Sequence, residues 1–271
     1  MDDRSLRELE LLAVARLYGL DARSRSDGDV PVASAPSGAP VEAGASRGAA
    51  VPARADRPAV RDRSPGEVAV PAPAPACAPE VAGIGTMDWN ALKAVVRDCN
   101  RCGLCKQRKQ AVFGVGHESA PWLFVGEGPG ADEDEKGEPF VGQAGKLLDG
   151  MLAAAKLQRG REVYIANVVK CRPPGNRVPS PEESAACAPF LDRQVDLIGP
   201  KLIVALGRTA AIRLTGQEVS LASLRGRVHA YRGIPLIVTY HPAYLLRNLP
   251  DKSKAWEDLL FARRTMAAAG T

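Results

Sequence analysis

Four short apolar runs, each ending in a polar, glycine or proline turn, constrain the fold of this chain more than any other feature. They alternate with stretches of helical character, an arrangement typical of buried parallel strands. The sequence therefore predicts a three-layer α/β/α domain with a central, mostly parallel, four-stranded sheet. The runs are "WLFVGEGPG" (122–130), "VYIANVVKC" (163–171), "KLIVALGRTAA" (201–211) and "IPLIVTYHP" (234–242). The predicted helices span residues 87–97, 143–157, 181–198, 208–214 and 254–266.

Polar residues and glycines stand at the ends of three of these runs. Gly126, Glu127 and Gly128 close the first strand, Asn167 closes the second, and His241 follows the last. In open parallel sheets, ligands bind in the crevice outside the carboxyl ends of the strands. We therefore expect these residues to converge on one site.

The residues before the domain have a different composition. Between residues 26 and 80 there is no Phe, Trp, Tyr, Leu, Ile, Met or Lys, and ten of the 22 prolines fall there. Such a stretch buries too little apolar surface to offset the entropy lost on ordering. We predict an amphipathic helix at 1–22, a disordered Ala/Pro-rich linker at 23–85 and a folded domain at 86–271. The helix either packs on the domain or binds a protein partner, and Cys77 in the linker is expected to have no role.

Charge and hydropathy limit which partners and which cellular compartment we expect for the chain. Residues 86–271 hold 26 Lys and Arg against 19 Asp and Glu, a balance compatible with nucleic acid that does not establish it. No run of about 18 apolar residues exists, so no membrane span is expected. Glu8, Glu10 and Arg16 interrupt the N-terminal helix, which is therefore no signal peptide. We expect a cytoplasmic monomer.

The stretch "GEGPGA" (126–131) matches the pattern of a dinucleotide-binding loop. Pro129 stiffens this turn, however, and we expect no helix to open after it. The acidic stretch "ADEDEKGE" (131–138) would repel a pyrophosphate rather than bind it. We therefore interpret the segment as a glycine-rich loop with a solvated acidic flank.

The cysteines are the strongest indication of a metal site. "RDCNRCGLC" (97–105) contains Cys99, Cys102 and Cys105, and Cys171 and Cys187 follow much later. Zinc sites usually combine two close pairs, often with histidines, whereas this pattern has one close group, one loose pair and no histidine near either. Disulfides are not expected without a secretion signal. Iron–sulfur clusters accept more varied ligand spacing, so the pattern favours a cluster and leaves zinc as the alternative.

Four longer segments resemble the family 4 uracil-DNA glycosylases over residues 99–249. They are "VFGVG", "GEGPGADEDEKGEPFVGQAGKLLD", "NVVKCRPPGNRVPSPEE" and "YHPAYLLRN". The resemblance implies a 4Fe-4S cluster held by four cysteines. Aligning "KQRKQAVFGVG" with the family implies Cys99, Cys102, Cys171 and Cys187 as the ligands and Cys105 as a spare. The alternative close pair is Cys102 with Cys105.

The resemblance also implies an activity, namely base excision repair. Such an enzyme flips uracil out of single- or double-stranded DNA and hydrolyses its N-glycosidic bond, leaving an abasic site. By similarity, Glu127 and His241 are catalytic, with Glu127 near the attacking water and His241 donating to uracil O2. Glu133 is a candidate second carboxylate. The uracil-binding residues implied are Gly126, Glu127, Gly128, Phe140, Asn167 and His241, of which Phe140 stacks on the base and Asn167 reads its Watson–Crick edge.

Two alternatives remain at this stage. One is a non-catalytic uracil-DNA binding module, and the other is a four-cysteine metal domain that binds nucleic acid without excising a base. One related group traps uracil-DNA covalently through a histidine in an added basic loop. No such insertion lies between Ser184 and His241, and His229 stands in what resembles an ordinary edge strand. The sequence thus favours turnover over trapping.

Overall fold

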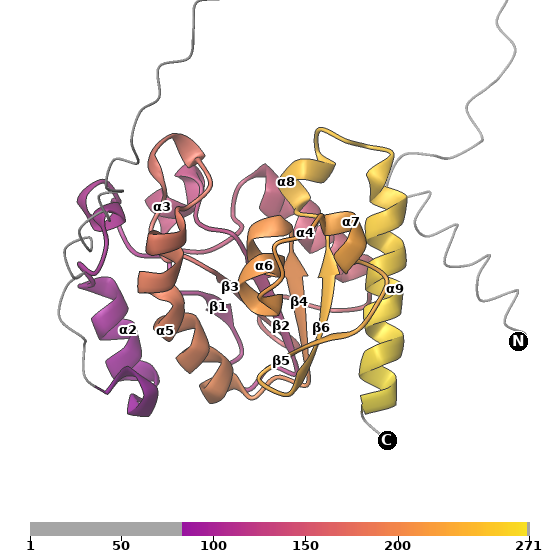
Figure 1. The fold of residues 1–271 in the computed structure, drawn as a ribbon, viewed down its shortest axis with the longest axis horizontal. Coiled ribbons are helices and arrows are strands. Elements are labelled where there is room, and N and C mark those ends of the chain that lie inside the picture. The colour runs from indigo at the N-terminus through magenta and orange to yellow at the C-terminus, as the bar shows by residue number, and fades with distance from the viewer. Residues whose placement is uncertain (1–82, 270–271) are drawn as a thin grey trace, which may run out of the picture.

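The strands of the sheet lie in the order β1-β3-β2-β4-β6-β5, with helices on both faces (Figure 1). This computed structural model describes residues 83–269. The predicted N-terminal helix at 1–22 lies outside the described residues, as does nearly all of the predicted linker at 23–85. The predicted three-layer α/β/α class is confirmed.

The four apolar runs form the four parallel strands at the centre of the sheet. β2 pairs with β3 on one edge and with β4 on the other, and β4 pairs with β6. Every residue of β2, β3 and β4 is buried, as expected for strands covered on both faces. The strands are β2 (Trp122–Gly126), β3 (Val163–Asn167), β4 (Leu202–Leu206) and β6 (Ile234–Thr239).

The prediction of four strands was wrong, because two short edge strands bring the sheet to six. β1 (Val115–Gly116) runs antiparallel to β3, and β5 (His229–Tyr231) runs antiparallel to β6. Arg232 and Gly233 join β5 to β6 with positive φ angles of 50° and 80°, as a tight hairpin requires. Neither edge strand is fully buried, so neither produces the apolar run on which the prediction depended.

The larger helices follow the predicted segments closely, and α5 has the predicted bounds. Ser180 caps α5 and exchanges hydrogen bonds with Glu183, while Pro181 occupies the first turn. The larger helices are α2 (Trp89–Arg97), α4 (Gln143–Ala154), α5 (Pro181–Ile198), α6 (Arg208–Thr215) and α9 (Asp251–Ala269). The shorter ones are η1 (Ile84–Thr86), η2 (Gly103–Lys106), α3 (Ala131–Lys136), η3 (Pro174–Asn176), α7 (Leu221–Leu224) and α8 (Pro242–Leu245).

Alternate side chains of the strands build a separate hydrophobic core on each face of the sheet. On one face, Leu123 and Val125 pack with α2, α5 and α6. On the other, Phe124 packs with α4, α8 and α9. Because both faces are covered, the open ends of the strands are the accessible part of the sheet.

The expectation that no helix follows the "GEGPGA" loop was wrong. α3 begins at Ala131, and its first turn carries Asp132, Glu133 and Asp134. Carboxylates at a helix N-terminus are favourable because they face the positive end of the helix dipole. Asp134 is buried and accepts a 2.9 Å hydrogen bond from the backbone nitrogen of Lys109, so this flank is only partly a solvated run.

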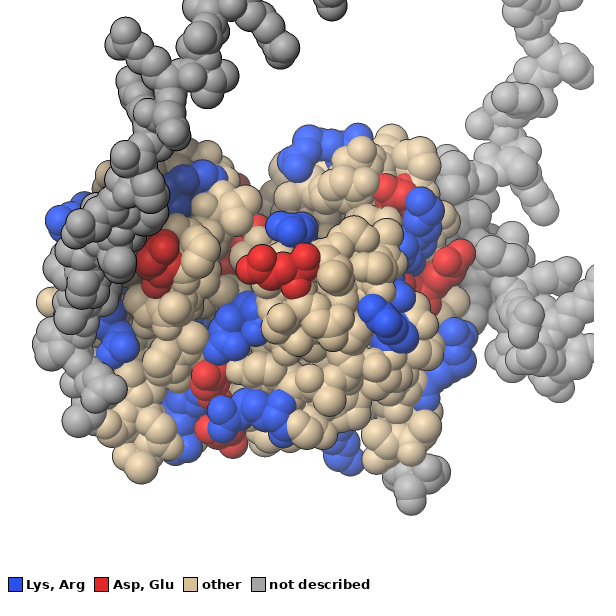
Figure 2. Space-filling model, in the orientation of Figure 1, with Lys and Arg blue, Asp and Glu red and all other residues tan. Residues whose placement is uncertain are grey.

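Charged side chains are interspersed on the face drawn in Figure 2, where Lys and Arg lie among Asp and Glu rather than in one patch. The net charge of the domain therefore does not by itself locate a nucleic-acid surface on that face. None of the helices within residues 83–269 is long and apolar enough to cross a membrane.

Candidate active site

A cavity of about 470 Å³ lies at the carboxyl ends of the parallel strands. Five of the six residues expected at this site from the sequence line the cavity, namely Glu127, Gly128, Phe140, Asn167 and His241. The sixth, Gly126, lies behind Asn167 and Phe140. The structure therefore brings the predicted strand-end residues together.

Gly126 lets an amide and an aromatic ring approach the same backbone. It pairs with Asn167 across β2 and β3. A Cβ added at Gly126 would lie 2.5 Å from Oδ1 of Asn167 and 2.7 Å from the Phe140 ring, so a larger residue would displace both. Asn167 is 2% exposed, and its Oδ1 accepts no hydrogen bond from the residues that the structure describes. A buried acceptor of this kind suits a ligand that brings its own donor.

His241 follows β6 and is held in one tautomer. Its Nδ1 accepts a 3.1 Å hydrogen bond from the backbone nitrogen of Ala243, so in the neutral ring the proton resides on Nε2. Burial, with a smaller contribution from the positive charge of Arg247, lowers the pKa of His241 to about 4 against an opposing effect of Glu133. At neutral pH the side chain is an uncharged imidazole with one N–H donor.

Glu127 is fixed at both its backbone and its side chain. Its carbonyl accepts a 3.1 Å hydrogen bond from the backbone nitrogen of Val169, which extends the pairing of β2 with β3. Its carboxylate accepts a hydrogen bond from the hydroxyl of Thr209 in the first turn of α6. Gly207, with φ of 87°, turns the chain from β4 into α6 so closely that a Cβ there would lie 2.8 Å from Cβ of His241.

Glu133 lines the cavity, but its carboxylate is occupied by backbone donors. Oε2 accepts a hydrogen bond from the nitrogen of Gly130 at 3.0 Å. Oε1 accepts from the nitrogens of Val141 at 2.9 Å and Gly142 at 3.0 Å. This arrangement favours a structural use of Glu133, whereas the carboxylate of Glu127 accepts from a single side-chain hydroxyl among the contacts described.

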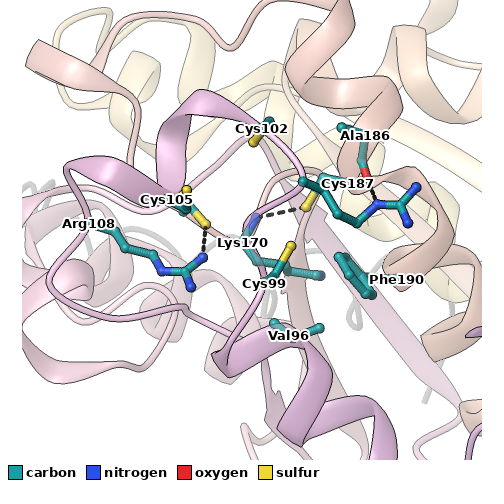
Figure 3. A pocket seen from close by; sticks show the side chains of 11 residues that line it. Val96, Cys99, Cys102, Cys105, Arg108, Lys170, Ala186, Cys187 and Phe190 are labelled. Carbon is teal, nitrogen blue, oxygen red and sulfur yellow. Dashed lines mark hydrogen bonds between the residues drawn. The ribbon is translucent and has the colours of Figure 1, made fainter. Parts of the chain in front are cut away.

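A second cavity is lined by five cysteines from three segments of the chain. The side chains of Cys99, Cys102 and Cys187 approach a common space in Figure 3. None of the five is in a disulfide. Among the described residues, no three His, Cys, Asp or Glu side chains are grouped closely enough to hold a single ion. The five are Cys99 after α2, Cys102 and Cys105 at η2, Cys171 after β3 and Cys187 on α5.

Comparison with known proteins identifies the family. The uracil DNA glycosylase superfamily matches residues 113–260, more than half of the chain. The "Type-4 uracil-DNA glycosylase" of Thermotoga maritima is 48% identical over 155 residues, covering 56% of this chain and 80% of that protein. The protein of the same name from Pyrobaculum aerophilum is 41% identical over 181 residues, covering 64% of this chain and 92% of that protein. The chain belongs to the type 4 uracil-DNA glycosylases. The family resemblance of its motifs is thereby confirmed.

The cysteine cavity of this type 4 glycosylase fits an anionic metal–sulfur group. Of the residues within 83–269 that line it, none is His, Asp or Glu, so this donor set is all sulfur, while Arg101, Arg108 and Lys170 contribute positive charge. Arg108 donates a 2.8 Å hydrogen bond to Sγ of Cys171. Burial raises the pKa of Cys171 to about 11, so its thiol remains protonated at neutral pH unless a metal displaces the proton.

Lys170 gives independent support for this fit. It is 1% exposed, and its ammonium group donates hydrogen bonds to two uncharged oxygens, the carbonyl of Asn167 at 2.8 Å and Oε1 of Gln194 at 2.6 Å. A buried cation whose hydrogen-bond acceptors are neutral is costly unless negative charge lies nearby. Its backbone nitrogen contacts Sγ of Cys187 at 3.3 Å, and metal-bound thiolates would supply that charge.

Sequence reasoning missed several residues of this type 4 glycosylase that hold the site in place. Thr209 contacts Glu127, and Arg159 contacts the backbone around Phe140. Thr209 follows the end of β4 and Arg159 precedes β3, but neither belongs to a recognisable motif, so no local signal distinguished them. A lysine within an apolar run, as in "NVVKC", was the one available signal for Lys170, because charged residues are rarely buried without a partner.

Proposed function

We propose that in this type 4 uracil-DNA glycosylase Phe140, Asn167, His241 and Glu127 excise uracil from DNA. The enzyme is a DNA-repair hydrolase that acts on N-glycosyl bonds. The observation that supports these roles is the convergence of Glu127, Asn167 and His241, from three separate strand ends, on one cavity. The substrate is uracil-containing DNA, and the expected compartment is the cytoplasm.

Base recognition uses the ring of Phe140 and the amide of Asn167. Uracil must leave the base stack to reach the cavity, which costs a few kcal/mol. Stacking on Phe140 offsets part of this cost. Asn167 provides a buried acceptor for the N3–H of uracil and a donor for its O4, a combination that matches the Watson–Crick edge of uracil.

His241 stabilises the departing base. When the glycosidic bond breaks, its electron pair moves onto uracil, and the negative charge is shared with O2. A neutral imidazole with its proton on Nε2 donates a hydrogen bond to O2 without giving up that proton. The uracil anion then takes a proton from solvent.

Glu127 acts on the sugar side of the bond. The deoxyribose develops positive charge as the base leaves, and a carboxylate close to it favours that charge. The same carboxylate orients a water molecule for attack on C1′ and accepts its proton. The contact with Thr209 holds the group in one orientation while it does so.

We propose that Cys99, Cys102, Cys171 and Cys187 bind a 4Fe-4S cluster and that Cys105 does not. When bound, the cluster supplies four metal–thiolate bonds, which join the segment after α2 to β3 and α5. Lys170 lies between the two cavities, since its ammonium group donates to the carbonyl of Asn167 and its backbone nitrogen donates to Sγ of Cys187. These four cysteines, with the cluster bound, would therefore support the backbone that carries the base-reading amide.

Release of the free base tests the function directly. The full chain is incubated with a single-stranded oligonucleotide that carries one labelled uracil, and a thymine oligonucleotide of the same sequence is the control. We expect free uracil and an alkali-sensitive abasic site from the first only. His241→Ala should slow single-turnover release by about 10² to 10³, the usual effect of losing one donor to a developing anion. Tight binding without release would instead support the non-catalytic binding module.

A further inference from the structure

The peptide bond between Phe140 and Val141 is held from both edges by opposite charges. The carbonyl oxygen of Phe140 accepts a 2.9 Å hydrogen bond from Nη2 of Arg159. The nitrogen of Val141, on the other edge of the same peptide plane, donates a 2.9 Å hydrogen bond to Oε1 of Glu133. Rotation of this peptide would break a charge-assisted bond on each side.

Both charged groups make further backbone contacts in the same region. The carboxylate of Glu133 also accepts from the backbone nitrogens of Gly130 and Gly142, each at 3.0 Å. Arg159 also donates from Nη1 to the carbonyl of Pro139 at 2.9 Å, so it binds two successive carbonyls. Asp149 of α4 orients the guanidinium by accepting a 2.8 Å hydrogen bond from its Nε. The side chain of Arg159 is 19% exposed, and water competes little for these contacts.

The backbone at Phe140 needs such support. Its φ angle is 56°, in the left-handed region that a bulky residue seldom occupies without external contacts. Helix α4 lies directly against the same carbonyl, since a Cβ added at Gly145 would lie 1.9 Å from the oxygen of Phe140. In this conformation the ring is 6% exposed, and its centroid lies 5.4 Å from that of His241.

We propose that Arg159 and Glu133 are positioning residues that hold the Phe140 ring in place for stacking on uracil. This inference rests on the proposed stacking role of Phe140. Because the strained backbone is fixed before the base arrives, the stacking surface requires no rearrangement on binding. Without the clamp, the backbone relaxes toward negative φ and carries the ring away from the base. The affinity for the base then falls, while contacts with the DNA backbone remain.

Free uracil as a competitive inhibitor measures the stacking site alone. Arg159→Ala should raise the inhibition constant of uracil by about 10-fold, which corresponds to about 1.4 kcal/mol, because part of the stacking contribution to base binding is lost. The dissociation constant for DNA with an abasic site should remain within about twofold of wild type. Arg161→Ala is the matched control, because the side chain of Arg161 is 73% exposed and its Nε lies 3.8 Å from the carboxylate of Glu162. It should leave both constants unchanged.

Two milder variants keep the test decisive if Arg159→Ala does not fold. Arg159→Lys retains the charge but cannot bind both carbonyls, and Asp149→Ala removes only the group that orients the guanidinium. Each should raise the inhibition constant of uracil in the same direction by a smaller factor. A wild-type inhibition constant in every folded variant would overturn the inference while leaving excision intact. Absence of excision in the wild-type chain would instead remove the proposed function.

Discussion

The hydroxyl of Thr209 donates a hydrogen bond to the carboxylate of Glu127 and so connects the first turn of α6 to the loop after β2. Thr209→Val keeps the shape of the side chain but removes this donor. We expect single-turnover excision to slow roughly 10-fold, as for the loss of one hydrogen bond to a charged group. Thr209→Ser should restore most of the rate. Equal rates in the valine and wild-type proteins would show that Glu127 needs no such support.

The low pKa of His241 determines a pH profile. Because burial lowers this pKa to about 4, the folded protein keeps the imidazole neutral as pH falls through 6.5, where a free histidine would gain a proton. Since the protonated ring carries charge that Arg247 disfavours, it accumulates only near pH 4 and below. We expect the excision rate to show no decrease attributable to histidine between pH 7 and pH 5. Single-turnover rates across this range are the measurement, and a midpoint near pH 6.5 would contradict the assignment.

Asn167 should determine selectivity more than affinity for DNA. Asn167→Ala removes the buried amide that we propose reads the Watson–Crick edge, so both excision and discrimination against cytosine and thymine should weaken. Loss of base-reading hydrogen bonds typically costs about 1–3 kcal/mol per unpaired group. The test compares excision of uracil with that of each other pyrimidine in one sequence context. An unchanged ratio would place base selection elsewhere in the cavity.

The cysteine assignment predicts different results for neighbouring thiols. Cys99→Ser should lose iron and the brown absorbance at roughly 400 nm that such clusters show. Cys105→Ser should retain both, although Cys105 lines the same cavity. Iron and acid-labile sulfide are measured in each variant after anaerobic purification. A stoichiometric zinc in colourless wild-type protein would replace the cluster with the zinc alternative.

A shortened chain should retain activity. Both cavities and all the contacts described above lie within residues 83–269. A fragment that begins near Thr86 should therefore excise uracil from a short oligonucleotide at a rate within about twofold of the full chain. We would measure it by single turnover beside the full protein. Complete loss of excision in a folded fragment would show that residues 1–85 contribute to catalysis.

The sequence predicts the parallel strands well because burial on both faces leaves a direct mark in the apolar runs. It also predicts α5 to the residue, since Ser180, Pro181 and Glu183 form a helix start that depends on local chemistry alone. The edge strands β1 and β5 leave no such mark, because they are two and three residues long and partly exposed. Their existence depends on the neighbouring strand rather than on their own sequence.

The residues of the site likewise divide into those that the sequence predicts and those that it does not. Glu127, Asn167 and His241 are foreseeable because strand ends of a parallel sheet must meet. Thr209 and Arg159 are not, since their contacts are with residues 82 and 19 positions away in the chain. Glu133 is a candidate second carboxylate from the sequence alone, and the structure adds that its carboxylate accepts from three backbone donors, a use that the sequence did not indicate.

The strand order also determines how long one edge of β2 stays unpaired in the nascent chain. β4 covers one edge of β2, yet it follows β2 in the chain by about 75 residues. At roughly 5–20 residues per second, that edge waits on the order of 4 to 15 s after β2 leaves the ribosome. An unpaired apolar strand edge readily joins other chains. A nascent chain stalled between Asn167 and Leu202 should therefore be the form most dependent on chaperones. Starvation for an amino acid that occurs in this segment should cause the enzyme to aggregate.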